Sequence, residues 1–313
     1  MIAGITSSLV AENYMPMSDN VLSIQHLSKS YGSLLALAAV SFEVPKGSIY
    51  GILGPNGSGK TTLLGILTDV LRPDSGQFML LDQADPALAR RKIGTLLETP
   101  NFYPYLSAYK NLEISAAIKG VSQMEIDRVL DRVGLLARKH SKFSTFSLGM
   151  KQRLSIGAAL LGDPEMLILD EPTNGLDPNG IAEIRDLIKG LSREGRTVLM
   201  ASHLLDEVEK VCTHVAIIKN GKLLASGSVG EVLASEDVIA LRAADLDQLA
   251  QILPGVKGYV SLERKDGLIL LHADLGIGSL EDINRYCFEN GVTLEHLTLQ
   301  RTSLEAKFLE ITH

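Results

Sequence analysis

A glycine-rich loop at residues 54–61 is the clearest candidate for chemistry in this sequence; it reads G-P-N-G-S-G-K-T. The pattern G-x-x-x-x-G-K-[ST] lets backbone N–H groups approach phosphate oxygens, and the positive dipole end of a following helix favours the same anions. Lys60 would supply charge to the β- and γ-phosphates, and the Thr61 hydroxyl would be a ligand of Mg²⁺. This phosphate loop (residues 54–61) therefore predicts a site for a nucleoside triphosphate with Mg²⁺. The residues expected to contact the nucleotide are Gly54, Pro55, Asn56, Gly57, Ser58, Gly59, Lys60, Thr61 and Thr62.

A second candidate is the stretch M-L-I-L-D-E-P at residues 166–172, an apolar strand that ends in two acids. Asp170 would hold Mg²⁺, and Glu171 would orient or deprotonate the attacking water. Alone, such a stretch is also typical of a buried strand that ends in solvated acids at a turn. Because it follows a phosphate loop, it favours hydrolysis of the nucleotide.

These loops need a scaffold, and the pattern of the chain predicts one in which strands and helices alternate. The expected strands are 21–27, 41–44, 48–53, 166–169, 197–201 and the hairpin 214–219/222–226, with strand-like segments in 76–97. The expected helices are 60–71, a run of helices in 107–162, 180–193 and 204–212. This order predicts an α/β domain with a largely parallel core sheet, and the helical stretch is an insertion into it.

The region after residue 235 differs in charge, since residues 236–313 contain 13 acidic and 7 basic residues. Two short strands (258–263 and 268–273) and three helices (243–252, 279–290 and 303–311) are expected there. We interpret the chain as an N-terminal extension (1–20), a nucleotide-binding domain (21–235) with a helical insertion at about 99–162, and a small α+β domain (236–313).

Composition excludes several classes of protein. The 313 residues are 45% hydrophobic and 21% charged, which excludes wholesale disorder. A net charge of −7 argues against a general nucleic-acid binder. No apolar run approaches the ~18–20 residues that cross a bilayer, and the first 17 residues lack the basic start of a secretory signal. Cys212 and Cys287 have no metal-ligand spacing and are expected to be free thiols.

The segment F-S-L-G-M-K-Q-R-L at residues 146–154 resembles the signature motif of ABC-type ATPases. It departs from the usual L-S-G-G-Q at Leu148 and Met150. In this family, the positions matched by Ser147 and Gly149 contact the γ-phosphate across a dimer, so the resemblance implies that two chains enclose two ATP molecules head to tail. The alternative interpretation is a plain helix start after a loop.

Three further residues match family positions in the same order along the chain. Tyr31 in K-S-Y-G resembles the aromatic residue that stacks on adenine; it could also be a tyrosine at a strand end. Asp177 in N-G-L-D-P resembles the acid of the loop that crosses the dimer interface; it could also open a helix as an Asp–Pro pair. His203 in A-S-H matches the histidine that contacts the γ-phosphate.

One departure from the family concerns Glu98, because most members have glutamine there. The resemblance implies a metal ligand, and a carboxylate could still serve; the alternative is a solvated loop acid. The pattern E-x-P-x-F-Y-P that begins at Glu98, and the tail at 303–312, resemble the bacitracin- and lantibiotic-resistance branch of ABC exporters. The tail could also be simply a docked terminal helix.

The resemblance implies a P-loop NTPase (RecA-like) core with an antiparallel β subdomain and an inserted helical subdomain. It implies the ATP-binding and ATP-hydrolysing subunit of an exporter, a homodimer or heterodimer at the cytoplasmic face of the membrane that drives separate integral-membrane permease subunits. The candidate cargo is a peptide antibiotic, a lipid-linked target or an amphipathic lipid-like molecule. The alternatives are a soluble ABC mechanoenzyme that acts on ribosomes or DNA, and a nucleotide-gated scaffold. Only about 85 residues separate Thr61 from Phe146, too few for the long coiled coil of the DNA-acting members. No nucleic-acid partner is expected.

Overall fold

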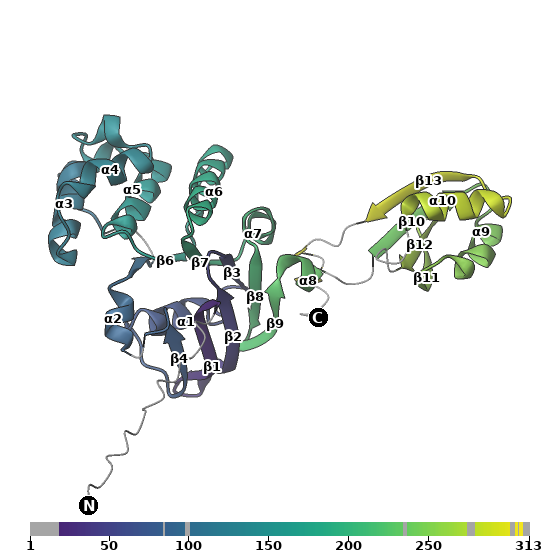
Figure 1. The fold of residues 1–313 in the computed structure, drawn as a ribbon, viewed down its shortest axis with the longest axis horizontal. Coiled ribbons are helices and arrows are strands. Elements are labelled where there is room, and N and C mark those ends of the chain that lie inside the picture. The colour runs from purple at the N-terminus through teal and green to yellow at the C-terminus, as the bar shows by residue number, and fades with distance from the viewer. Residues whose placement is uncertain are drawn as a thin grey trace, which may run out of the picture.

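The computed structural model describes residues 19–83, 85–97, 101–233, 237–273 and 279–300, with 304, 305, 307 and 308 near the C-terminus. Its centre is a six-stranded sheet in the order β5-β6-β7-β3-β8-β9 (Figure 1). The strands are β3 (Ile49–Leu53), β5 (Ile93–Leu96), β6 (Met166–Asp170), β7 (Thr197–Ser202), β8 (His214–Lys219) and β9 (Lys222–Ser228). All neighbours are parallel except β8 and β9. The central strands β3, β6 and β7 are buried along their full length, as parallel strands covered on both faces must be.

A second, antiparallel sheet has the order β2-β1-β4 and comprises β1 (Asn20–Tyr31), β2 (Leu34–Pro45) and β4 (Ser75–Leu80). Helix α1 (Lys60–Leu67) follows the phosphate loop. Leu63 and Leu64 of α1 belong to one apolar cluster with side chains of both sheets. The phosphate loop is therefore anchored on one side by β3 and on the other by a helix packed into the core.

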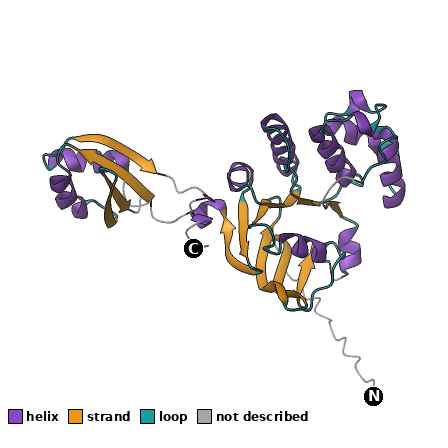
Figure 2. Cartoon of the chain, turned by 180° about the vertical axis from the view of Figure 1, so that it is seen from behind, coloured by secondary structure: helices purple, strands orange, loops and turns teal. Residues whose placement is uncertain are grey.

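The helical insertion contains α3 (Ala108–Lys119), α4 (Glu125–Arg132) and α5 (Leu148–Leu160), which gather on one side of the central sheet (Figure 2). Ser107 caps the start of α3 by accepting a hydrogen bond from the Lys110 N–H, and Gly120 ends it in the left-handed region with φ of 68°. Two short 3-10 turns, Leu136–Arg138 and Phe143–Thr145, join α4 to α5.

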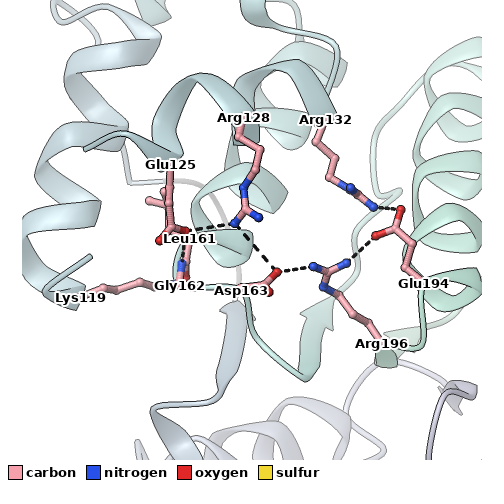
Figure 3. Close-up of polar contacts among 9 residues, drawn as sticks. All are labelled: Lys119, Glu125, Arg128, Arg132, Leu161, Gly162, Asp163, Glu194 and Arg196. Atoms are coloured by element: carbon pink, nitrogen blue, oxygen red, sulfur yellow. Dashed lines mark hydrogen bonds and ion pairs between the residues drawn. The ribbon is translucent and has the colours of Figure 1, made fainter. Parts of the chain in front are cut away.

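Polar contacts join the insertion to the core at the end of α4 (Figure 3). Arg132 of α4 pairs with Glu194, which also accepts from Arg196 Nη1 at 2.6 Å. Arg196 pairs in turn with Asp163, which lies 4.0 Å from Arg128. We call these five residues the junction network. Nearby, Lys119 Nζ donates to three backbone carbonyls at the end of α5.

Three more helices follow the core strands: α6 (Pro178–Arg193), α7 (Leu205–Val211) and α8 (Val229–Leu233). The short helix α2 (Pro86–Arg90) precedes β5. Ile184 and Ile188 of α6 and Val208 of α7 share an apolar cluster with the insertion and with the central strands. Within the described ranges, no helix combines the length and apolar character that crossing a bilayer requires.

The C-terminal unit has its own antiparallel sheet in the order β11-β12-β10-β13. It comprises β10 (Asp237–Ala243), β11 (Tyr259–Lys265), β12 (Leu268–Ala273), β13 (Leu294–Gln300), α9 (Leu246–Ile252), the 3-10 turn Leu253–Gly255 and α10 (Leu280–Glu289). Its buried side chains form a separate apolar cluster. In both overall views this unit stands apart from the rest of the chain (Figures 1 and 2).

The predicted fold class, a P-loop core with antiparallel and helical subdomains and a small α+β addition, is confirmed. Several boundaries were wrong. The helix expected to reach Leu71 ends at Leu67, because Asp69 takes a left-handed conformation with φ of 65° and the Leu71 N–H turns back to the Gly65 carbonyl. The strand-like stretch 76–97 contains the helix α2, which Asp85 caps.

In the C-terminal unit, two strands, β10 and β13, were not predicted. The helix expected at 243–252 begins at Leu246, since the residues before it form β10, and β13 was not anticipated. In the cassette, β2 runs from Leu34 to Pro45, so it begins seven residues before the strand expected at 41–44. Residues 1–18 of the N-terminal extension expected at 1–20 lie outside the described residues, and β1 already begins at Asn20. Most of the helix expected at 303–311 also lies outside them.

Candidate functional site

The phosphate loop opens into a cavity of about 590 Å³, a size typical of small-molecule sites. The loop runs from the carboxyl end of β3 to the start of α1. The lining residues come from the β1–β2 hairpin, the phosphate loop, the start of α1, α5, the end of β6 and the segment after it. They are Tyr31, Leu34, Ala36, Asn56, Gly57, Ser58, Gly59, Lys60, Thr61, Thr62, Leu148, Gln152, Asp170, Glu171 and Asn174.

The backbone of the loop has a shape that only glycine accepts. Gly59 has φ of 110°, and a Cβ atom there would lie 2.4 Å from the Ala36 carbonyl oxygen. Gly59 is also the N-cap of α1 and contributes no capping side chain, so the first N–H groups of the helix remain available to an anion. The buried Ser58 hydroxyl, which lines the cavity, lacks a hydrogen-bond partner among the described residues. These features fit a bound phosphate chain.

Lys60 lies at the centre of the site, and only 6% of its surface is exposed. Its Nζ donates to the Gly54 carbonyl at 2.7 Å and lies 3.7 Å from Glu171 Oε1. Burial lowers the pKa of Lys60, and the nearby carboxylates of Glu171 and Asp170 oppose that shift. The ammonium is therefore poorly solvated, and it borders the cavity, where the negative charge of a phosphate would stabilise it.

Thr61 and Asp170 meet at the carboxyl end of β6. The Thr61 hydroxyl donates to Asp170 Oδ2 at 3.1 Å, and Asp170 is buried. A hydroxyl and a carboxylate side by side, next to a place for phosphate oxygens, match the oxygen ligands that Mg²⁺ prefers. The donor set therefore fits this ion.

Glu171 and His203 face each other across the ends of β6 and β7. His203 Nδ1 lies 2.9 Å from Glu171 Oε2, so the carboxylate contacts the imidazole through one oxygen and Lys60 through the other. Glu171 has φ of 47°, a left-handed conformation that is rare for a residue with a side chain and is found at functional sites. Its N–H donates to the Ala201 carbonyl, which ties this conformation to β7.

The chain is similar to known proteins along most of its length. Residues 37–174 match the family described as ABC transporter. The ATP-binding protein YdbJ of Bacillus subtilis (strain 168) is 38% identical, over 95% of this chain and 96% of its own length. The chain belongs to the ABC transporter ATP-binding family. It is accordingly an ATPase, as the cassettes of that family are.

Two further proteins are also similar to this chain. The bacitracin transport ATP-binding protein BcrA of Bacillus licheniformis is 37% identical, over 93% of this chain and 97% of its own length. The solved structure of cbiO1 from Clostridium perfringens, part of the ABC transporter complex cbiONQ, has a TM-score of 0.64 and 31% identity over 70% of this chain and 92% of that one. The expected family is thus confirmed.

In this ABC cassette, the other predicted residues lie at the edge of the site or outside it. Tyr31 lines the cavity and is exposed at the end of β1. Ser147 is the N-cap of α5 and accepts from the Met150 N–H, and Asp177 is the N-cap of α6 and accepts from the Gly180 N–H. Both therefore make the local contacts that the alternative interpretations anticipated.

Gly149 packs beside Gly180 and Leu176 of the same chain. Ser147, Gly149 and Asp177 are absent from the described lining of the ABC cassette's cavity. Glu98 lies outside the described residues.

The ABC cassette's cavity also includes residues that sequence reasoning did not select. Leu148 and Gln152 come from the signature segment, and Asn174 comes from the N-G-L-D-P segment, so the motifs contained them without singling them out. Leu34 and Ala36 follow the turn after Tyr31 and belong to no motif. Only the pairing of β1 with β2 brings Leu34 and Ala36 near the phosphate loop, and that pairing was not predicted.

Proposed function

We propose that this chain is the ATP-binding and ATP-hydrolysing subunit of an ABC exporter. The observation that carries the proposal is the contact of Glu171 with both Lys60 and His203 beside the phosphate loop. Lys60 and the loop's N–H groups bind the β- and γ-phosphates. Glu171 accepts a proton from the attacking water, and His203 orients that carboxylate and contacts the γ-phosphate.

Metal binding belongs to the same proposal. Thr61, Asp170 and Glu98 would hold Mg²⁺, which supplies charge neutralisation for the phosphates. Glu98 would bring a third oxygen ligand to the pair formed by Thr61 and Asp170. Replacing Glu98 with glutamine tests this part, because an unchanged Mg²⁺ dependence of turnover would remove it from the ligand set.

The nucleotide is enclosed, in this proposal, between two cassettes. Tyr31 stacks on adenine from one side, while Ser147, Gly149 and Asp177 of the second cassette close the other side. The exposure of Tyr31 and Leu148 at the cavity supports such a closure, since both leave apolar surface open to solvent in a single chain. The second cassette is an identical chain or a related one.

Separate integral-membrane permease subunits would receive the motion of this dimer at the cytoplasmic face of the membrane. The helical insertion offers a docking surface at its start, where Tyr103 and Tyr105 are both largely exposed and their rings lie 5.8 Å apart. The similarity to BcrA over nearly the full chain supports a peptide antibiotic of the bacitracin kind as cargo. In this proposal residues 21–235 are the cassette and 236–313 an accessory domain.

The decisive experiment uses the variant Glu171→Gln of the full chain, tagged and expressed in its native host. Glutamine keeps the shape but accepts no proton, so the variant should bind ATP, lose hydrolysis and accumulate as a dimer. The matched control is Glu165→Gln, at the opposite end of β6, where the carboxylate pairs with Lys92 on the surface. The control should hydrolyse ATP at the normal rate and remain monomeric in ATP.

The trapped variant also identifies the partner. Membranes are solubilised gently, and the proteins that co-purify are identified. A polytopic membrane protein in stoichiometric amount would support the exporter, whereas ribosomes or DNA-bound proteins would favour a soluble mechanoenzyme. A Glu171→Gln chain that stays strictly monomeric with ATP and Mg²⁺ would contradict the two-cassette arrangement.

A further inference from the structure

The last described residues of the chain return to the cassette. Leu304 is fully buried and belongs to the same apolar cluster as Val208 and Val211 of α7. Its backbone N–H donates to Glu209 Oε2 at 2.9 Å, although 95 positions separate the two residues in the sequence. The terminal segment is therefore attached to α7, the helix that begins two residues after His203.

Phe308 lies one helical turn beyond Leu304 and packs against the same cluster. It borders a cavity of about 260 Å³ next to the nucleotide site. The other lining residues are Gly54, Pro55, Asn56, His203 and Leu205. The Phe308 ring thus lies beside both the start of the phosphate loop and the loop that carries His203.

The loop that carries His203 is also held by the Leu204 N–H, which donates to Ser202 Oγ at 3.0 Å, and by the packing of α7 into the core. Helix α7 has only seven residues, and a helix this short is held by packing rather than by its own hydrogen bonds. The imidazole makes one polar contact within the described part of the chain, with Glu171. Packing of the terminal segment on α7 adds to the contacts that fix the imidazole.

We propose that Leu304 and Phe308 form a terminal clamp that holds the His203 loop against the phosphate loop, so that the imidazole keeps its contact with Glu171. The inference rests on the role proposed for His203. Phe308 is a positioning residue, since it acts through His203 and touches no reacting atom. Displacing a catalytic group by about 1 Å can lower a rate by up to ~100-fold, whereas nucleotide binding relies on Lys60 and the loop backbone.

The test measures kcat, the KM for ATP, the Kd of a fluorescent ATP analogue and the melting temperature of the full chain. Phe308→Ala should lower kcat about tenfold while Kd and KM change less than about twofold. Phe308→Leu, which keeps apolar bulk, should recover most of the lost kcat. The matched control is Phe288→Ala, because Phe288 lies on α10 of the C-terminal unit and is 72% exposed; this variant should behave like the wild type.

A double variant separates positioning from a general structural role. In a His203→Ala background, Phe308→Ala should have no further effect on kcat, because the group through which it acts is gone. Independent, multiplicative losses would overturn the inference, as would a Phe308→Ala chain with normal kcat. If His203→Ala itself retains full turnover, the proposed role of His203 fails instead, and the clamp fails with it.

Discussion

Strands β6 and β7 have a cluster of charged residues at each end, and the two clusters differ in kind. At the carboxyl ends, Asp170 ends β6, Glu171 follows it and His203 follows β7, beside Lys60. At the amino ends, Asp163 precedes β6 and Arg196 precedes β7, within the junction network (Figure 3). Both clusters pair acids with bases, yet only the first borders the nucleotide cavity.

The difference lies in burial. Glu171 is 21% exposed and its partner Lys60 only 6%, whereas Glu194 and Asp163 of the junction network are 41% and 60% exposed. Removing charges from water costs free energy, and the attraction between the paired charges offsets only part of that cost. Exposed ion pairs lose little hydration and contribute little to the stability of the fold. The carboxyl-end cluster thus contributes little to the stability of the fold, whereas its buried cation suits the binding of an anion. Parallel α/β sheets place ligands at this edge as a rule.

The largest expected effect that tests this contrast is that of Lys60→Ala. It removes the main cation of the carboxyl-end cluster, so the affinity for ATP should fall by more than about 100-fold. The control is Lys92→Ala, since Lys92 precedes β5 and forms an exposed pair with Glu165. Titration with a fluorescent ATP analogue measures both variants. Unchanged affinity in Lys60→Ala would refute the assignment of the phosphate loop.

A smaller effect is expected from His203→Ala. Without the imidazole, Glu171 loses its 2.9 Å contact and kcat should fall about 10- to 100-fold, while the Kd for ATP changes little. His214 offers a control at the opposite edge of the sheet, where it opens β8 and contacts the Thr213 hydroxyl. If His214→Ala slowed turnover as much as His203→Ala, the two edges would not differ in function.

The sequence was sufficient to predict the carboxyl-end cluster because each part is a short local motif. The phosphate loop and the stretch 166–172 each identify a strand end, and carboxyl ends of parallel strands meet at one edge. The contacts of Ala36 and Phe308 with the phosphate loop and its surroundings could not be predicted, since they join segments far apart in the chain. Periodicity within a segment contains no information about such pairings.

The C-terminal unit shows the same limit for secondary structure. In β13, the exposed residues Glu295 and His296 follow one another, so the strict alternation that marks a strand is lost. In β10, Ile239, Ala240 and Leu241 are all fully buried, and a short apolar run of this kind fits a helix as well as a strand. Pairing of β10 with both β12 and β13 decides the outcome, and that pairing is tertiary.

The smallest expected effect is that of Arg132→Ala in the junction network. Arg132 pairs with an exposed carboxylate, so its loss should cost about 0.5–1 kcal/mol, lower the melting temperature by about 1–3 °C and leave kcat unchanged. In about 1 M NaCl the difference from wild type should vanish, because salt screens exposed pairs. Glu194→Ala and the double variant complete a cycle that isolates the pair energy. A loss above ~3 kcal/mol, or a fall in kcat, would mean that the amino-end cluster does more than hold the insertion to the core, and the contrast between the two edges would fail.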